Sequence, residues 1–162
     1  MTGTPPGFDD GSPGDGPPED GLVVTTEHDR LSLGETLVAA VIDAVCASEG
    51  VRVASLSVVL AGHDLVHAVN RDWLGHDYPT DVVSFGLDET AAARGVLDGE
   101  IYVDLDTAEE RAPEFGATFT AEALRYVAHG ALHIAGHDDA TDDQRAAMRA
   151  LEDRALAAAG VL

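Results

Sequence analysis

Three histidines and two aspartates gather in one short stretch, which reads His129-Gly-Ala-Leu-His133-Ile-Ala-Gly-His-Asp-Asp139. Residues at positions i and i+4 share one face of an α-helix, so His129 and His133 can bind a single metal ion together. The opposite face of the same helix carries only apolar side chains, namely Leu124, Ala128, Ala131 and Ala135. The pattern predicts a helix that packs on a core through one face and lines a cleft with its imidazoles.

A zinc site that keeps one position open needs a third protein ligand. His137 follows His129 by two helical turns or more, a rise of about 12 Å on an unbroken helix, whereas metal–ligand bonds measure about 2 Å. Gly136 is expected to end the helix and let the chain turn back, so that Asp139 reaches the ion. The order His-x-x-x-His-x-x-Gly-x-x-Asp resembles the placement of the last ligand in metzincin proteases. We therefore predict His129, His133 and Asp139 as ligands, with His137 as the alternative.

Metzincin-type proteases carry a glutamate directly after the first histidine, where it acts as general base. Gly130 occupies that place in this chain. A peptidase without its base is disfavoured, so the same metal geometry is expected to serve another reaction. A small metallopeptidase remains an alternative that digestion of casein would test.

The composition is typical of one folded domain. The chain has 162 residues, of which 45% are hydrophobic, enough to form a buried core. It contains no apolar run long enough to span a membrane and no N-terminal signal peptide. A single cysteine, Cys46, excludes a disulfide framework and predicts no disulfide-linked partner. These features favour a cytoplasmic protein without a membrane association.

The charge balance is strongly acidic, with 30 Asp and Glu against 9 basic residues and a net charge of -21. All the basic residues are arginines. Such a charge repels nucleic acids and anionic membranes in dilute salt. The surface fits either an enzyme that avoids acidic partners or adaptation to a salty cytoplasm, where the Debye length is about 3 Å at 1 M. We favour adaptation to salt, which requires folding stability to rise from low to molar salt.

Residues 1–21 differ in composition from the rest of the chain. Five of the seven prolines lie there among many glycines and aspartates, at Pro5, Pro6, Pro13, Pro17 and Pro18. A segment with so little to bury is expected to be a disordered acidic tail, solvated rather than an interaction segment. Residues 22–162 are expected to form a single domain.

Strands and helices alternate along that domain. Capping boxes at Ser32–Glu35 and Thr141–Gln144 open the first and last helices, and Thr118 or Thr120 caps the helix that carries the histidines. Pro113 disturbs a short helix that stops at Gly116. The expected strands are 23–26, 51–60, 82–85 and 100–105. The first helix is expected to run from the capping box at Ser32 to Gly50, followed by helices over 63–73 and 107–115. The histidine helix is expected to run from its threonine cap to about Ala135, and the last helix from the capping box at Thr141 through Met148, Leu151 and Ala155. This order predicts an α/β or α+β fold, with a small, mostly parallel mixed four-stranded sheet, helices packed on it and the metal site on a central helix.

Three ordered blocks make the chain similar to the YbeY family of metal-dependent endoribonucleases and rRNA maturation factors. The histidine stretch resembles the family signature His-Gly-x-Leu-His-x-x-Gly-x-Asp-His. Pro79 to Phe85, preceded by Asn70 and Asp77, resembles its Pro-Thr-Asp-Val-Leu-Ser-Phe block. Gly99 to Val103 resembles its Gly-Asp-Ile-x-Ile strand. Three blocks in matching order from about residue 22 to 156 are far more specific than one His-x-x-x-His pair.

The resemblance implies a compact α/β fold, one bound zinc ion per chain and hydrolysis of single-stranded RNA. It also implies a role in rRNA maturation, at the 3′ end of 16S rRNA, and in quality control of ribosomes, with rRNA and the small ribosomal subunit as partners. A non-catalytic, zinc-bearing ribosome-associated factor is the other alternative. Two positions depart from the family pattern: Asp139 stands where most members have His, and Leu74 where many have Arg.

The substrate cleft is expected to include Thr80, Asp81, Ser84 and Asp138, although turn chemistry around Pro79 also explains the first three. Asp138, Asp81 and Glu100 are candidates for the general base by chemistry alone, and a ribose 2′-hydroxyl is as good a nucleophile as water. His63 and His67 form another i, i+4 pair, but no third ligand follows at a useful spacing. We therefore expect that second pair to be solvated or to cap a helix.

Overall fold

The computed structural model describes residues 21–162, so the expected tail 1–21 lies outside the described residues except for Gly21. Those residues form a four-stranded sheet, five α-helices and two short 3₁₀ helices. The strands are β1 (Leu22–Glu27), β2 (Arg52–Ala61), β3 (Val82–Gly86) and β4 (Val96–Asp104). The helices are α1 (Glu35–Glu49), α2 (His63–Leu74), η1 (Ala92–Arg94), α3 (Leu105–Arg111), η2 (Ala112–Phe115), α4 (Phe119–Ile134) and α5 (Asp142–Ala158).

The sheet has the strand order β1-β2-β4-β3. β1, β2 and β4 are parallel, and β3 pairs with β4 in the antiparallel direction, with Ser84 opposite Ile101. Parallel strands require crossover connections, which α1 and the segment from α2 to η1 supply. The prediction of a mostly parallel mixed sheet with helices packed on it is confirmed.

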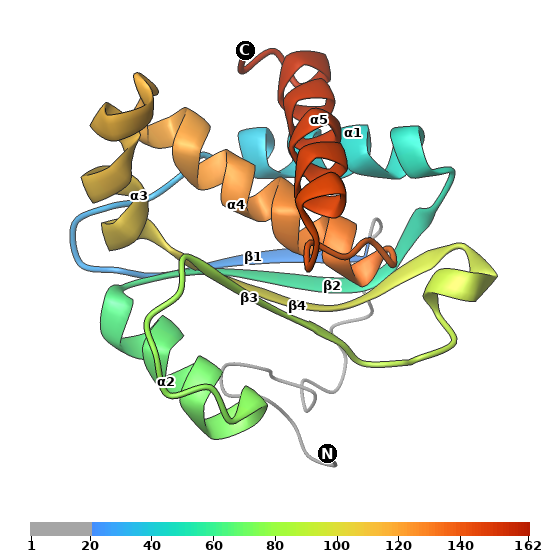
Figure 1. The fold of residues 1–162 in the computed structure, drawn as a ribbon, viewed down its shortest axis with the longest axis horizontal. Coiled ribbons are helices and arrows are strands. Elements are labelled where there is room, and N and C mark those ends of the chain that lie inside the picture. The colour runs from blue at the N-terminus through green and yellow to red at the C-terminus, as the bar shows by residue number, and fades with distance from the viewer. Residues whose placement is uncertain (1–20) are drawn as a thin grey trace.

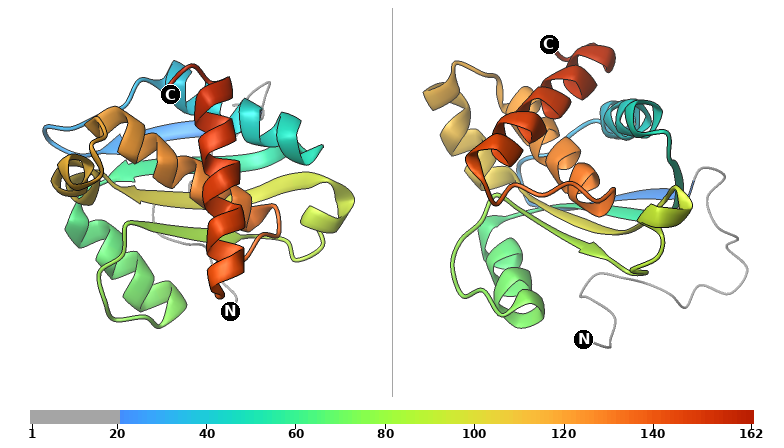
Figure 2. Two further views of the ribbon diagram at one scale, coloured as in Figure 1. Left: turned by 45° about the horizontal axis from the view of Figure 1, so that its top comes forward. Right: turned by 45° about the vertical axis from the view of Figure 1, so that its right-hand side comes forward.

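The helices cover the two faces of the sheet unequally. α1, α3, α4 and α5 lie on one face, and α2 lies on the other (Figures 1 and 2). The larger apolar core lies under the four helices, and a smaller one lies under α2, where Tyr102 and Phe85 meet edge to face. Within residues 21–162, no helix combines the length and the apolar character needed to cross a bilayer.

α4 is the central helix of the larger layer, between the sheet and α5. Its apolar face is buried as the sequence predicts, with Leu124, Ala128 and Ala131 fully enclosed. The Thr118 side chain accepts a hydrogen bond from the Ala121 amide at 3.0 Å, which decides between the two candidate caps. Gly130 brings the helix close to β4, because a Cβ at this position would lie 2.7 Å from a methyl group of Ile101.

The prediction of a capping box at Ser32–Glu35 is wrong. α1 begins at Glu35, its N-cap is Gly34, and no side chain caps it. Leu33 is buried in the larger core, which draws the preceding segment into the core before the helix begins. The second predicted capping box is confirmed, since Thr141 and Gln144 bond reciprocally at the start of α5.

The strand expected at 100–105 begins earlier and ends one residue sooner. β4 starts at Val96, where it pairs with Arg52 of β2, and it ends at Asp104. Asp104 then caps α3, accepting hydrogen bonds from the amide and the hydroxyl of Thr107 at 2.9 and 2.8 Å. Pro113 acts as expected, because α3 gives way there to a 3₁₀ turn that Gly116 ends at φ 64°.

Candidate metal centre

The chain reverses directly after α4, which brings Asp139 back beside the helix. The α-helical segment ends at Ile134, and Gly136 adopts φ 111°, a region open to glycine but rarely to other residues. The amide of His137 then donates to the carbonyl of Leu132 at 3.0 Å. The predicted glycine break is thus present, and the segment that follows carries Asp139 to the imidazoles.

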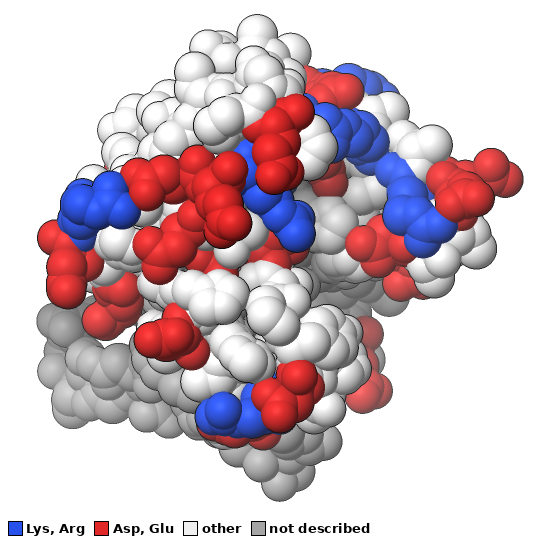
Figure 3. All heavy atoms as spheres, turned by 60° about the vertical axis from the view of Figure 1, so that its left-hand side comes forward, with Lys and Arg blue, Asp and Glu red and all other residues white. Residues whose placement is uncertain are grey.

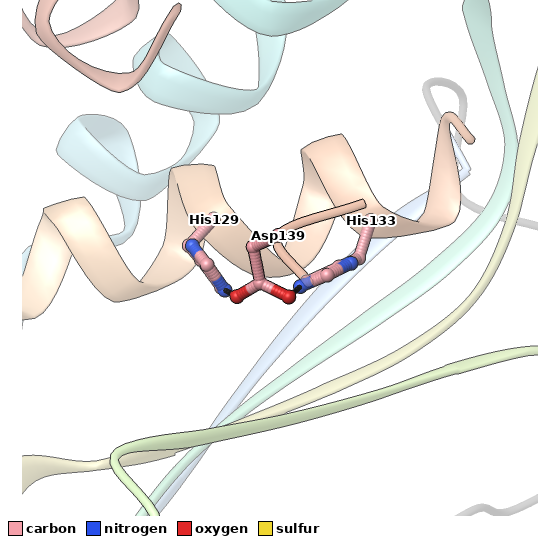
Figure 4. Close-up of side chains that lie close together, drawn as sticks. All are labelled: His129, His133 and Asp139. Carbon is pink, nitrogen blue, oxygen red and sulfur yellow. Dashed lines mark ion pairs between the residues drawn. The ribbon is translucent and has the colours of Figure 1, made fainter. Parts of the chain in front are cut away.

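His129, His133 and Asp139, called the triad below, face one another on the open side of α4 (Figure 4). Nε2 of His129 lies 3.3 Å from one carboxylate oxygen of Asp139, and Nε2 of His133 lies 3.4 Å from the other. One ligand atom from each residue can be chosen so that all three lie within 4.8 Å of one another. All three side chains are partly exposed, so a substrate can approach.

The donor atoms of the triad fit a zinc ion. A tetrahedral ion with bonds of about 2.1 Å holds its ligand atoms roughly 3.4 Å apart. Each nitrogen lies at about that separation, 3.3 and 3.4 Å, from a different oxygen of Asp139, and a set with one ligand atom per residue lies within 4.8 Å, so a small shift of the carboxylate would complete the site. Two imidazoles and one carboxylate leave a fourth position for water or substrate, the arrangement of catalytic rather than structural zinc sites.

Each imidazole of the triad is oriented by a hydrogen bond at its other nitrogen. Nδ1 of His129 lies 2.7 Å from a carboxylate oxygen of Glu152, and Nδ1 of His133 lies 2.9 Å from the backbone carbonyl of His137. These acceptors place the proton on Nδ1 and leave the lone pair of Nε2 free for a metal. Two histidines fixed in the metal-binding tautomer by different partners are a stronger indication of a metal site than proximity alone.

Glu152 holds His129 from α5, the outermost helix. Its side chain is almost fully buried and also accepts a hydrogen bond from Arg125 at 3.1 Å. Arg125 donates in turn to Asp153 at 2.6 Å. Burial would lower the pKa of His129, but the hydrogen bond and charge of Glu152, with the charges of Asp139 and Asp81, outweigh it and raise that pKa.

The raised pKa of His129 predicts how metal affinity depends on pH. In the metal-free protein, the protonated His129 and Glu152 contribute stability that is fully present below the ordinary histidine pKa and is lost as pH rises through the raised one. A metal must displace that proton, so zinc affinity should increase as pH rises through the raised pKa and then level off. Competition with a chromophoric chelator at a series of pH values measures this. An affinity independent of pH across that window would contradict it.

Replacing Glu152 with glutamine should weaken zinc binding by about tenfold to a hundredfold, the usual cost of losing the group that orients a metal-bound histidine. The substitution keeps the size of the side chain but removes the charge that polarises His129. Asp153→Asn is the matched control, because Asp153 is bonded to Arg125 and not to His129. Equal zinc affinities of the two variants in a chelator competition would show that Glu152 has no such role.

The side chain of His137 lies away from the triad. Its Nε2 makes a short contact with the carboxylate of Glu49 at the end of α1. Only its backbone carbonyl serves the site, through His133. Of the two candidates for a third ligand, the structure brings Asp139 rather than His137 to the two imidazoles.

Two cavities meet at the triad. The arginine cavity, about 290 Å³, is formed by α3, α4 and α5 and contains Arg111, Arg125, Arg145 and Arg149. The β3 cavity, about 460 Å³, is formed by β3, the segment before it, the end of α2 and the end of α4. His129, Asp139 and Asp81 line both cavities. The triad therefore lies where two hollows join.

The structure separates the expected cleft residues. Thr80, Asp81 and Ser84 line the β3 cavity, whereas Asp138 is exposed and lines neither cavity. Glu100, a candidate base, lies in β4 and is completely buried. Burial raises the pKa of its carboxyl group, and the Tyr102 hydroxyl donates a hydrogen bond to it at 2.7 Å. It cannot reach a substrate at the triad. Among the three candidates, only Asp81 borders the site.

The other histidine pair, His63 and His67, belongs to the opposite layer. Nδ1 of His63 lies 2.9 Å from Asp104, and Nε2 of His67 lies 3.0 Å from Asp77. Each ring thus pairs with its own carboxylate, and the two do not share a third partner within the described residues. The pair is partly exposed, in line with the expectation of a solvated pair.

Comparison with known proteins decides the family. The family model described as Endoribonuclease YbeY matches residues 24–160. The chain belongs to the YbeY family. Its relatives include proteins named Endoribonuclease YbeY from Chlorobaculum tepidum, 44% identical over 78% of this chain and 90% of that protein, and from Salinibacter ruber, 44% identical over 86% and 94%. The solution structure of TM1509 from Thermotoga maritima is similar with a TM-score of 0.55 and 27% identity, covering 83% of this chain and 90% of that one.

The two departures from the YbeY pattern both lie at the site. Asp139 stands at the position of the expected family histidine and presents both carboxylate oxygens to the imidazoles. Leu74, where arginine was expected from the family resemblance, is 39% exposed and lines the β3 cavity. The β3 cavity therefore has no arginine, and the arginines near the triad all lie in the other cavity.

Gly130 is a packing position in this YbeY protein. Its hydrogen faces Ile101 of β4, and any side chain would meet that buried residue. A glutamate base of the metzincin kind has no room here. This removes the arrangement by which a metallopeptidase of that kind would work.

Two residues of the site, Glu152 and Arg125, were not expected from the sequence. Both are charged residues on helices, where the usual interpretation is a surface ion pair. One signal does point to Glu152: it follows Met148 by one helical turn and so lies on the apolar stripe of α5. A carboxylate on a buried face needs a partner, and here the partners are His129 and Arg125.

Proposed function

We propose that this protein is a zinc-dependent endoribonuclease that cleaves single-stranded RNA, with one zinc ion per chain bound by His129, His133 and Asp139. We further propose that its substrate is rRNA on the small ribosomal subunit, in maturation of the 3′ end of 16S rRNA and in quality control of ribosomes. The cytoplasm is where these substrates would be met. Family membership supports the RNA-cleaving activity, since the curated relatives are named endoribonucleases.

The observation that carries this proposal is the fixed tautomer of both histidines beside a returning carboxylate. Glu152 and the His137 carbonyl hold the two Nδ1 protons, so both Nε2 lone pairs face Asp139. A structural site would use a fourth protein ligand, whereas this one opens onto two cavities.

Zinc bound at such a site lowers the pKa of a water molecule to about 7 and polarises a phosphoryl oxygen. The residues of this chain would position the RNA strand and accept the proton that the attacking nucleophile loses. Asp81 is the side chain best placed for the proton, because it borders both cavities beside His129. Asp81→Asn should then lower kcat while leaving bound zinc unchanged.

The direct test is incubation of the full-length purified protein with rRNA and with a short single-stranded RNA, in low and in molar salt. Cleavage should stop with a chelator and return with added zinc, and casein should remain intact. Cleavage that survives the chelator, or that is absent at every salt concentration, would contradict the proposal. Zinc retained without any cleavage would favour the non-catalytic ribosome-associated factor instead.

The same assay identifies the nucleophile. A single 2′-deoxy sugar at the cleaved linkage blocks attack by the neighbouring hydroxyl but leaves attack by water possible. Cleavage of that substrate at an unchanged rate would assign the attack to water. Loss of cleavage, with a cyclic phosphate on the normal product, would assign it to the ribose.

A further inference from the structure

The arginine cavity concentrates positive charge in a very acidic protein. Four of the nine arginines line it, although the chain carries a net charge of -21. Figure 3 shows arginine side chains bordering a hollow on one face, with acidic side chains between them. The cavity shares His129 and Asp139 with the triad, so a group bound in it lies next to the metal position.

Two of the four arginines form close ion pairs with carboxylates of the protein. Arg125 is bound by Glu152 and Asp153, and its side chain is only 12% exposed. Arg145 contacts Asp142 and donates to the carbonyls of Asp139 and Ala140 at 3.2 and 3.0 Å. These two hold the walls of the cavity in place.

The other two arginines keep their charge available. Arg111 approaches Asp81 only at 3.5 Å, the outer limit of a hydrogen bond. Arg149 has no ion pair within residues 21–162 and lies over the ring of Phe115, 6.0 Å from its centre. They come from α3–η2 and from α5, so they approach the cavity from different elements.

Tyr126 adds a third possible donor to the cavity. The hydroxyl of Tyr126 is buried and no acceptor meets it with hydrogen-bond geometry, although the Glu122 carboxylate lies close enough to act on it. A buried donor without a well-aligned acceptor costs free energy unless a ligand or water satisfies it. Burial, together with the nearby Glu122 carboxylate, raises the pKa of Tyr126, so this group stays a neutral donor. Tyr126 lines the same cavity as Arg111 and Arg149.

We propose that the arginine cavity binds a phosphodiester of the RNA strand next to the one at the metal, with Arg111, Arg149 and Tyr126 as donors. The inference rests on the proposed function and adds to it the side of the triad on which the backbone is held. It also explains how a protein with Leu74 in the β3 cavity would hold RNA, since the cationic contact lies on the opposite side of the triad. Glu122 also lines the cavity and has no ion pair within residues 21–162, so its negative charge should weaken binding of a phosphodiester.

The test measures binding of a labelled single-stranded 2′-O-methyl RNA to the zinc-loaded full chain by fluorescence anisotropy at several salt concentrations. Arg111→Gln with Arg149→Gln should weaken binding by about tenfold or more and reduce the salt slope by about one per arginine. Arg52→Gln with Arg154→Gln removes the same charge outside the cavity and should leave both values nearly unchanged. Glu122→Gln should strengthen binding.

A neutral methylphosphonate, moved along the strand one linkage at a time, identifies the phosphate. At one linkage, the methylphosphonate should weaken binding of the RNA to the natural protein but not to the R111Q/R149Q variant. The reason is that the methylphosphonate and the two arginine substitutions remove the same contact. No such position, or equal losses in the two double variants, would overturn the proposal. Inorganic phosphate that competes through the same arginines while no linkage shows this coupling would indicate a site for free anions, which also overturns it.

The outcome separates this inference from the proposed function. RNA cleaved with zinc, but bound equally by the natural protein and the R111Q/R149Q variant, overturns the phosphate site and leaves the activity standing. RNA bound through the two arginines and never cleaved supports the phosphate site and contradicts the activity.

Discussion

His133→Ala should yield a folded protein that no longer retains zinc and that cleaves RNA at least about a thousandfold more slowly, because the metal contributes several kcal/mol to the transition state. The change leaves one imidazole and one carboxylate, too few to hold the ion against dilution. Metal analysis after gel filtration gives the occupancy, and single-turnover cleavage gives the rate. His133 is partly exposed, so its removal opens no sealed cavity.

His137→Ala is the matched control. It removes an imidazole four residues further on, but keeps the backbone carbonyl that orients His133. Its ring contacts Glu49 instead of the triad, so zinc occupancy and cleavage should remain near those of the natural protein. Loss of zinc from H137A as well as from H133A would assign the third ligand to His137.

Gly99→Ala should destabilise the fold by about 3 kcal/mol or more, at the upper end of the usual cost of overpacking. A Cβ at this position would lie 2.1 Å from the carbonyl oxygen of Phe85 and 3.0 Å from a methyl group of Ile134. The first clash is with backbone, so it can be relieved only by separating β3 from β4. The second is with the residue after His133, so zinc affinity should fall as well. Urea denaturation and zinc competition measure the two effects.

Gly86→Ala tests whether this effect is specific. Gly86 is the direct partner of Gly99 in the β3–β4 pairing, but a Cβ there would have no atom within 4 Å. Its substitution should leave stability unchanged or raise it slightly, since alanine restricts the unfolded chain. Similar losses at both positions would show that glycine is needed for the strand pairing in general rather than for the close approach.

The triad could be predicted because its information is local. His129 and His133 are set by helical periodicity, and Asp139 follows within one chain reversal at Gly136. The apolar stripe of α4 was equally visible, since it follows the same periodicity. For these residues, a few torsion angles decide which side chains meet.

The partners of the triad could not be predicted in the same way. Glu152 meets His129 across the packing of α5 on α4, and the position of α5 depends on the whole core. His137 shows the same limit at short range, because its backbone and not its ring supports the site. Sequence spacing cannot distinguish those two roles without the path of the chain.

Two of the differences between expected and observed element boundaries, at the starts of β4 and α1, have a common physical origin. Asp98 and Gly99 are residue types typical of turns, yet they continue β4 because both pair with β2 and Gly99 also pairs with Gly86 of β3. Serine is a residue type that often caps helices, which is why a helix start was expected at Ser32. Because Leu33 is buried, α1 begins only at Glu35. In both places, tertiary contacts outweigh a local preference of about 1 kcal/mol.

The central claim is that one zinc ion is bound between the two imidazoles and the returning aspartate. Anomalous diffraction at the zinc edge, from crystals of untagged and freshly purified protein, tests it most directly. We expect a single strong peak about 2.0 to 2.2 Å from Nε2 of His129, Nε2 of His133 and an oxygen of Asp139. No peak there, or a peak beside His137 and Glu49 instead, would contradict the account.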